Sequence, residues 1–321
     1  MTPRKLILSN QQSPGDIVML TAAVRDLHAS FPGDYVTDVR TPCPDLWLHN
    51  PFITPLGDDE PDVEYLPCHY PLIHQSNQRP FHFIHGFIEY LGERLGVRVL
   101  PNQFKGDIHL AEEEKEGPFA GMEEIAGRPF WLIAAGGKFD FTIKWWDIAR
   151  YQQIVNHFAD RLLFVQVGED GHHHPALEGV IDLRGKTSLR ELLLLMYHAQ
   201  GVVCPVTLLM HLAAAVETPP GRPPNRPCVV VAGGREPVHW EAYPYHQFLH
   251  TLGMLECCAR GGCWRSRTVA LGDGNSNDHP HSLCADVVGN LPRCMDMITA
   301  EDVVRAINGY LSGGLYQTLN S

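Results

Sequence analysis

The 321-residue chain lacks features that would assign it to several broad classes of protein. No segment approaches the roughly 18 consecutive apolar residues of a membrane-spanning helix, so we expect no membrane span. The apolar run Leu6 to Leu8 is too short for the core of a signal peptide, which predicts a cytoplasmic protein. We find no repeat of fixed period in the sequence, which argues against a solenoid or a propeller.

Positive charge is also scarce. Lys and Arg total 25 against 37 Asp and Glu, which gives a formal net charge of −12. Nucleic-acid backbones are bound through basic stripes, so this composition argues against a nucleic-acid partner. A small anionic ligand stays compatible with the composition, because a few local hydrogen-bond donors are enough to bind one.

Cysteine is present in quantity but unevenly spaced. Five of the nine cysteines lie in the last fifth of the chain, at Cys257, Cys258, Cys263, Cys284 and Cys294. Four thiolates in a tetrahedron suit Zn²⁺ or a single iron, so the spacing Cys258-x4-Cys263-x20-Cys284-x9-Cys294 predicts a structural metal site. Cys257 stays open as an alternative to Cys258, and reduced thiols without a metal are the other interpretation. The polar loop between the cysteine pairs has little apolar surface to bury, so we expect a metal to organise it.

Apolar runs that end near glycine alternate with amphipathic stretches in the second half of the chain. We expect strands at 130–135, 162–167, 180–183, 201–204 and 228–232, and helices at 147–158, 188–198 and 208–216. The first half begins in the same way, with a strand at 5–9, a tight loop and a helix at 17–27, followed by a strand at 35–40 and a helix at 83–95. This alternation is typical of a doubly wound α/β sheet, whose ligands bind at the carboxyl ends of the strands.

The acidic stretch 112–118 reads as an exposed linker and places a domain boundary near residue 117. We therefore predict a first domain at 1–117 and a second at 118–250. A cysteine metal finger would follow at 251–298 and a C-terminal helix at 299–321, opened by the capping box Thr299-x-x-Asp302.

Three loops at expected strand ends are candidate ligand-binding segments. Gly15-Asp16 precedes a helix, where Asp16 could cap the helix or act as a general base. Gly136-Gly137-Lys138, with Lys144 close by, could approach a phosphate, although a solvated turn is the alternative. Glu169 follows a third strand, where a carboxylate could hold ribose hydroxyls.

Two further segments permit opposing interpretations. Arg235 and Trp240 follow a strand, where they could clamp a diphosphate and stack on a base, or form an ordinary packed turn. The run His172-His173-His174 is expected to be a solvated loop, because adjacent histidines cannot all face one ion.

Several motifs together resemble glycosyltransferase family 9, the ADP-heptose-dependent heptosyltransferases. They are Gly15-Asp16, Lys144-x-Trp146, the segment 187–192 (Thr-Ser-Leu-Arg-Glu-Leu) and the segment 207–215 (Thr-Leu-Leu-Met-His-Leu-Ala-Ala-Ala). The resemblance implies two facing Rossmann-like domains, the GT-B fold, and sugar transfer from a nucleotide diphosphate donor without a catalytic metal. It implies these roles: Asp16 as the base, Lys144 on the donor phosphates, Glu169 on the nucleoside, and Thr207 and His211 lining the phosphates.

The cysteine-rich segment is similar to the C-terminal iron finger of the autotransporter heptosyltransferases, which modify protein serine hydroxyls and can form large rings. This resemblance implies iron or zinc at the four cysteines and an acceptor that is a protein or a glycan. It also keeps a homo-oligomer among the options.

We therefore expect an inverting glycosyltransferase that moves a sugar, heptose from ADP-heptose, to a hydroxyl acceptor. One departure leaves alternatives open: the family's Asp-Thr-Gly is Val206-Thr207-Leu208 in this chain. A different donor, or a non-catalytic sugar-nucleotide-binding scaffold of the same fold, is compatible with that change. An epimerase acting on a sugar nucleotide would need further acid and base residues that the sequence does not reveal.

Overall fold

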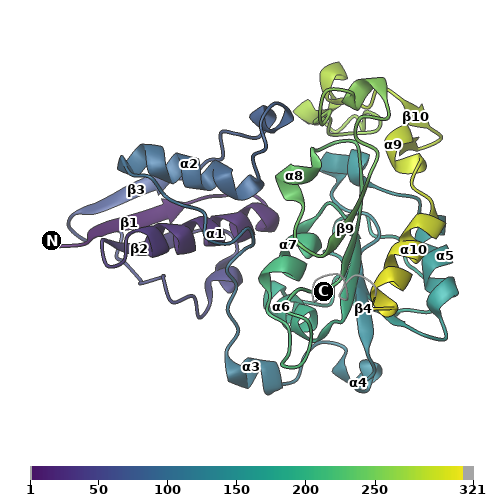
Figure 1. Cartoon of the computed structure of the whole chain (residues 1–321), viewed down its shortest axis with the longest axis horizontal. Helices are drawn as coiled ribbons and strands as arrows, with labels where there is room; N and C mark the ends of the chain where they lie inside the picture. Colours follow the sequence, from purple (N-terminus) through teal and green to yellow (C-terminus); the bar gives the residue numbers. More distant parts are fainter. Residues whose placement is uncertain (1, 314–321) are drawn as a thin grey trace.

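The computed structural model describes residues 2–313 and contains two parallel sheets, one from each half of the chain (Figure 1). The expected α/β class with parallel sheets is confirmed. Residues 314–321, the end of the predicted C-terminal helix segment 299–321, lie outside the described residues. No helix between residues 2 and 313 is long and apolar enough to cross a lipid bilayer.

The N-terminal sheet has three parallel strands in the order β2-β1-β3. The strands are β1 (Arg4–Ser9), β2 (Tyr35–Arg40) and β3 (Val63–Pro67). Two helices, α1 (Pro14–Ser30) and α2 (Phe83–Leu95), pack against each other beside this sheet. The bounds of β2 and α2 are those expected from the sequence. β3 was not expected, because only one of its five residues is buried and its apolar pattern is correspondingly weak.

The C-terminal sheet has six parallel strands in the order β6-β5-β4-β7-β8-β9. The strands are β4 (Phe130–Ile133), β5 (Leu163–Gln166), β6 (Ile181–Asp182), β7 (Gly201–Pro205), β8 (Cys228–Gly233) and β9 (His246–His250). The central strands β4 and β7 are buried along their whole length, as expected for a parallel sheet covered on both faces. That burial explains why continuous apolar runs marked them in the sequence.

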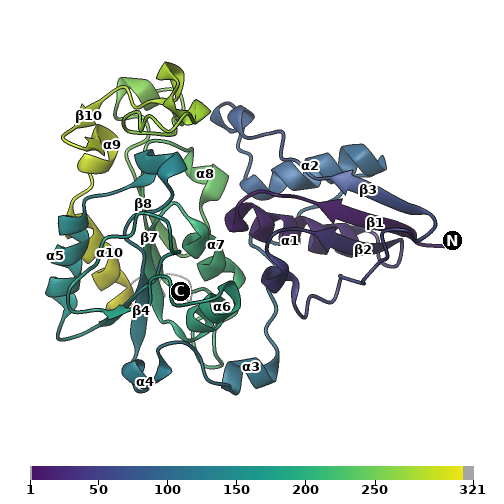
Figure 2. The same ribbon diagram turned by 180° about the vertical axis from the view of Figure 1, so that it is seen from behind.

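Helices cover both faces of the C-terminal sheet (Figures 1 and 2). The helices of this half are α4 (Met122–Ile125), α5 (Ile148–Phe158), α6 (Leu189–His198), α7 (Leu208–Ala215), α8 (Val238–Glu241), α9 (Arg293–Asp296) and α10 (Ala300–Leu311). α7 packs against α1, so the largest hydrophobic core is continuous between the two halves. α5 and α10 pack together on the opposite face and form a second core.

Arg190, on α6, joins the two halves near the segment where the chain passes from the first half to the second. Its guanidinium donates to the carbonyl oxygens of Asp45, at 3.1 Å, and His109, at 3.0 Å. It also donates to Glu114 Oε1 at 2.7 Å. Glu114 belongs to α3 (Glu112–Glu116), so the acidic stretch, predicted to be an exposed linker, contains a short helix held by an ion pair.

A second contact joins the halves at the other end of their boundary. The Asn77 side-chain amide pairs with both backbone groups of Gly262, donating to its carbonyl at 2.9 Å and accepting from its N–H at 2.8 Å. Trp264 Nε1 donates to the same Asn77 oxygen at 3.1 Å. The cysteine-rich segment therefore reaches across to the N-terminal half.

The cysteine-rich segment has little regular structure beyond 3-10 turns, the hairpin of β10 (Val287–Val288) and β11 (Leu291–Pro292), and the short helix α9 that contains Cys294. Its polar loop is organised by Arg267, which is fully buried and pairs with Asp273 at 2.7 Å and with Asp278. We had expected a metal to supply this order. The ion pairs show that the loop also has internal anchors of its own.

Candidate functional site

A cavity of about 880 Å³ is lined by residues from both halves of the molecule. All eight residues that the sequence analysis assigned to the base and the donor line this one cavity. They are Gly15, Asp16, Gly137, Lys138, Lys144, Glu169, Thr207 and His211. The structure brings them together because each follows the carboxyl end of a parallel strand or lies in the helix that comes after it.

Asp16 is in the first turn of α1, where its Oδ2 accepts a hydrogen bond from the Ser13 backbone N–H at 3.1 Å. The capping interpretation is therefore correct for this residue. The same carboxyl group lines the cavity. Burial raises the pKa of Asp16, while a hydrogen bond from Tyr70 and the charge of Lys144 act in the opposite direction. Capping and proton acceptance are thus compatible, because the cap leaves the other carboxylate oxygen for Tyr70 or a substrate.

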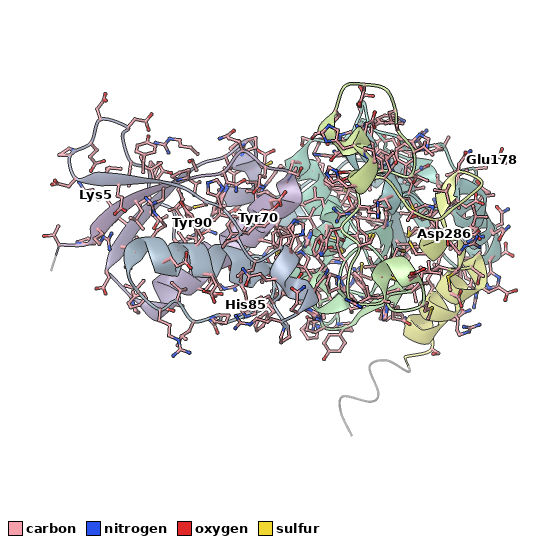
Figure 3. All side chains as sticks on the ribbon, turned by 90° about the horizontal axis from the view of Figure 1, so that it is seen from above. Lys5, Tyr70, His85, Tyr90, Glu178 and Asp286 are labelled. Carbon is pink, nitrogen blue, oxygen red and sulfur yellow. The ribbon has the colours of Figure 1, made fainter. Side chains whose placement is uncertain are left out.

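Tyr70 is a cavity residue that sequence reasoning missed. Its hydroxyl accepts from Gln12 Nε2 at 3.1 Å and hydrogen-bonds to Asp16, so it links the Gln12–Asp16 loop to the segment after β3. Figure 3 shows Tyr70 on the side of the N-terminal half that faces the C-terminal half, far from Lys5. Tyr70 follows β3, the strand with the weakest sequence signal, so no pattern pointed to it.

Lys144 is a half-buried cation of the cavity wall. Its Nζ lies 3.0 Å from Glu236 Oε1, and the same carboxylate pairs with Arg235. Burial lowers the pKa of Lys144 to about 8, and the charge of Arg235 acts in the same direction. The ion pair with Glu236 favours the charged ammonium, so we treat Lys144 as cationic at neutral pH.

Lys138 is a second amino group on the cavity wall. Its Nζ donates to Ser13 Oγ at 2.8 Å, which connects the loop after β4 with the N-cap of α1. This hydrogen bond joins the two halves at the cavity itself.

The loop after β4 requires glycine. Gly136 has φ +114°, and a Cβ there would lie 1.9 Å from the carbonyl oxygen of His173. Gly137 N–H donates to that same carbonyl at 2.8 Å, and the His173 ring stacks on Trp145 with centroids 4.0 Å apart. The histidine run is therefore packed against the cavity loop, whereas we had expected it to be solvated. Glu169 lies at the cavity mouth with 69% of its side chain exposed.

The N-terminus of α7 supplies Thr207 and His211. Thr207 is the N-cap residue but its side chain makes no capping hydrogen bond. His211 Nδ1 lies 2.6 Å from Tyr243 Oη, and burial lowers its pKa to about 3, so its ring is neutral at neutral pH. A Cβ at Gly15 would lie 3.2 Å from the His211 ring, which shows how closely α1 and α7 approach each other.

The segment after β8 adds four side chains to the cavity wall: Arg235, Glu236, Trp240 and Glu241. Trp240 is 1% exposed and stacks on Phe83 with centroids 5.1 Å apart, which favours the packed-turn interpretation for that residue. Glu236 and Glu241 are both buried carboxylates, and the sequence analysis gave them no role. Their position after an expected strand was the signal that could have identified them.

The five C-terminal cysteines lie in one region but differ in environment. Cys258 is buried, with its Sγ 3.5 Å from the Leu255 carbonyl oxygen, whereas Cys257 is exposed. Burial, followed by repulsion from Cys258, Cys263 and Cys284, raises the pKa of Cys257 to about 11. Burial and repulsion from Cys263, Cys284 and Cys257 likewise raise the pKa of Cys294, to about 12.

A metal site requires that several side chains point at one ion, which is a stricter condition than lying in the same region. Within residues 2–313, no three His, Cys, Asp or Glu side chains are arranged to hold a metal ion. The metal site therefore stays a prediction.

Residues 93–220 match the sequence model of glycosyltransferase family 9 (heptosyltransferase), which is less than half of the chain. The match includes Gly137, Lys138, Lys144, Glu169, Thr207 and His211 and excludes Asp16. No curated protein matches the sequence.

Solved structures show the same fold at low sequence identity. The iron-containing dodecameric glycosyltransferase TibC from enterotoxigenic E. coli H10407 is 18% identical, with a TM-score of 0.61 over 99% of this chain and 78% of that chain. The E. coli ADP-heptose lps heptosyltransferase II is 15% identical, with a TM-score of 0.55 over 99% of this chain and 100% of that chain. A glycosyl transferase family 9 protein from Veillonella parvula is 14% identical, with a TM-score of 0.58 over 77% and 86%. The family match and these folds support a glycosyltransferase.

Proposed function

We propose that this protein is an inverting glycosyltransferase of GT-B architecture that transfers heptose from ADP-heptose to a hydroxyl acceptor. The observation that carries the proposal is the shared cavity, in which Asp16 of the N-terminal half faces the cations Lys144, Lys138 and Arg235. A structure of TibC, 17% identical to this chain, is a complex with ADP-D-beta-D-heptose, which supports the choice of donor.

In the proposed reaction, Asp16 accepts the proton of the acceptor hydroxyl. The acceptor oxygen forms a bond to the anomeric carbon as the bond from that carbon to the diphosphate breaks, so one displacement inverts the configuration. ADP leaves with the electron pair of the broken bond. Lys144 and Lys138 stabilise the charge that develops on the diphosphate, and the hydroxyl of Thr207 donates a hydrogen bond. His211, being neutral, contributes a hydrogen bond or a packing surface and no charge.

Glu169 is proposed to hold the ribose from the mouth of the cavity, where its exposed carboxylate is free to accept hydroxyl hydrogen bonds. The phosphates would lie between Gly137 and the N-terminus of α7, where the bare glycine backbone and the helix dipole favour an anion. No catalytic metal takes part in this proposal.

For the cysteine-rich segment we propose a structural iron or zinc. The donor set fits a thiophilic ion, because Cys263, Cys284 and Cys294 lie within electrostatic range of one another and of Cys257, which is itself in range of Cys258. Either Cys257 or Cys258 would be the fourth ligand. Bound metal would cross-link segments that are far apart in the sequence. A homo-oligomer and a protein or glycan acceptor complete the proposal, and the dodecameric state of TibC supports the oligomer.

A non-catalytic sugar-nucleotide-binding scaffold is the second candidate function. Val206 and Leu208 favour it, because both line the cavity where the family has an aspartate and a glycine. The scaffold predicts donor binding without turnover.

Transfer and slow hydrolysis of ADP-heptose by the purified chain distinguish the two functions. Turnover that Asp16→Asn abolishes while ADP binding persists supports the transferase. ADP-heptose binding with no turnover in either protein supports the scaffold.

A further inference from the structure

Two buried carboxylates line the cavity and have no part in the mechanism above. Glu236 and Glu241 are each 5% exposed. The Oε2 atom of each is buried without a hydrogen-bond partner among residues 2–313. A buried carboxylate oxygen without a donor is costly, so such atoms in a cavity wall indicate donors that a ligand supplies.

The two carboxylates differ in what holds them. Glu236 pairs through its other oxygen with Lys144 and Arg235, so it is already engaged as a counter-ion. Glu241 interacts with Lys144 and Arg235 only at longer range, so it is not committed to a close ion pair in the way that Glu236 is. Glu241 is therefore the carboxylate with the most capacity to accept a hydrogen bond from a ligand.

The position of Glu241 is fixed by its neighbours in the fold. It is the last residue of α8, directly after Trp240, whose ring is buried against Phe83. A side chain anchored beside a buried aromatic has little freedom to turn away from the cavity.

The charged groups that act on Glu241 indicate where it lies relative to the reacting groups of the proposed mechanism. It interacts with Lys144, which is proposed to bind the leaving diphosphate, and with Asp16, which is proposed to face the acceptor. In a single displacement the transferred sugar lies between those two groups. Glu241 lies in range of both Lys144 and Asp16, so its carboxylate faces the sugar between them. The hydroxyl groups of the sugar can donate the hydrogen bond that Glu241 Oε2 lacks.

We propose that Glu241 accepts a hydrogen bond from a hydroxyl group of the transferred sugar and so selects the donor by its sugar. The inference rests on the proposed function, because it requires a sugar diphosphate in this cavity. A phosphate oxygen is excluded as the partner, since it offers no proton to a carboxylate and would be repelled by it.

Calorimetric titration of the full chain with ADP and with ADP-heptose tests the proposal. The proteins are the wild type, Glu241→Ala and the nearly isosteric Glu241→Gln, each checked for unchanged thermal unfolding. Glu169→Gln is the matched control, because it changes the same functional group at the nucleoside end of the cavity.

We expect Glu241→Ala to bind ADP-heptose about 10-fold more weakly or worse, the effect of losing one hydrogen bond to a charged group. Glu241→Gln should show a smaller loss that is again confined to ADP-heptose, because its amide oxygen still accepts a hydrogen bond but carries no charge. The affinity of both variants for ADP should be unchanged or higher, because a carboxylate near the phosphates has been removed. Glu169→Gln should weaken both ligands by the same factor.

Equal losses for ADP and ADP-heptose in both Glu241 variants, or no loss for either, would overturn the role of Glu241 and leave the proposed function standing. A wild type that binds neither ligand would overturn the proposed function and the inference with it. If Glu241→Ala unfolds, Glu241→Gln alone decides between these outcomes.

Discussion

Asp16 has a structural role in the fold and a proposed role in the chemistry. Its Oδ2 caps α1 by accepting from the Ser13 backbone, while its carboxyl group lines the cavity and hydrogen-bonds to Tyr70. The cap fixes the direction of the carboxylate, so the general base would be held in place by the same bond that starts the helix.

Asp16→Asn should reduce sugar transfer by a factor of about 10² to 10⁴, because an amide cannot accept a proton from the acceptor. The amide oxygen can still cap α1, so the free energy of unfolding should change by less than about 1 kcal/mol. Steady-state kinetics and chemical denaturation measure the two effects. ADP affinity is the control, and its loss in parallel with turnover would contradict the assignment of Asp16 as the base.

The pH dependence of transfer should report on Asp16. Burial raises its pKa, so the ionised base disappears at a higher pH than for an ordinary aspartate, and kcat/KM should fall as the pH decreases through that range. The hydrogen bond from Tyr70 lowers this pKa, so Tyr70→Phe should shift the acidic limb of the profile to higher pH. An unshifted limb in Tyr70→Phe would show that another group controls it.

Whether a residue of the site could be predicted depends on the strand that precedes it in the sequence. Lys144, Glu169 and Thr207 could be predicted because they follow apolar runs that mark buried parallel strands. Tyr70 could not, because it follows a half-exposed strand with no clear period. Glu241 was visible in the sequence, but its burial depends on the packing of Trp240 against Phe83, a contact between residues far apart in the chain.

At the scale of elements, Arg190 ties α6 to the N-terminal half through Glu114 and two backbone carbonyls. Arg190 lowers the pKa of Glu114 to about 2. A lowered carboxyl pKa contributes stability above the pH at which the unfolded carboxyl titrates, and this stability is lost as the pH falls through the folded value.

Arg190→Ala should therefore lower the free energy of unfolding by about 1–2 kcal/mol at pH 7, after allowance for partial exposure. The difference from wild type should shrink as the pH falls from about 5 toward 2. Urea denaturation at several pH values measures it. Arg305→Ala is the control, because Arg305 pairs with Asp302 but is 77% exposed and should have almost no effect. An Arg190 effect that is independent of pH would show that the backbone contacts, and not Glu114, carry the stability.

Two adjacent thiols of the cysteine-rich segment, Cys257 and Cys258, have different surroundings. Cys257 is exposed and within electrostatic range of Cys258, Cys263, Cys284 and Cys294, whereas Cys258 is buried and its Sγ contacts the carbonyl oxygens of Thr251 and Leu255. Cys257→Ser should consequently lower the iron or zinc content of the purified protein, and Cys258→Ser should leave it closer to one ion per chain. Elemental analysis of both variants measures this difference. The reverse pattern would support Cys258 as the ligand, and metal-free wild type would refute the site.

The cysteine-rich segment also shows why the contacts that order a loop could not be predicted from the sequence. The composition of the polar loop predicts a segment that a metal organises. The structure buries Arg267 and pairs it with Asp273 and Asp278, and no pattern in the sequence points to these ion pairs. β3 and β9 were missed for a related reason: their residues are only partly buried, so neither gives a continuous apolar run.

At the scale of the whole molecule, the cavity exists only where the two halves meet. Lys138 reaches Ser13 across that boundary, and α7 packs on α1 behind it. A nucleotide that contacts both walls binds the folded state alone, so saturating ADP should stabilise the chain by about 2–3 kcal/mol at 100 times its Kd. A rise of a few degrees in Tm would report this in a thermal-shift measurement. UDP and GDP serve as controls, and equal shifts with all three would argue against an adenosine donor.

The contact between Asn77 and Gly262 has a consequence for how the two halves can evolve. Asn77 pairs with the backbone of Gly262, so no side chain at position 262 contributes to the recognition. A Cβ at Gly262 would lie 2.3 Å from the carbonyl oxygen of Arg235, so that position is restricted by volume alone. Position 77 is restricted by hydrogen-bonding chemistry instead. No compensating exchange at 262 can rescue a loss at 77, and the two positions should show no covariation although they are in direct contact.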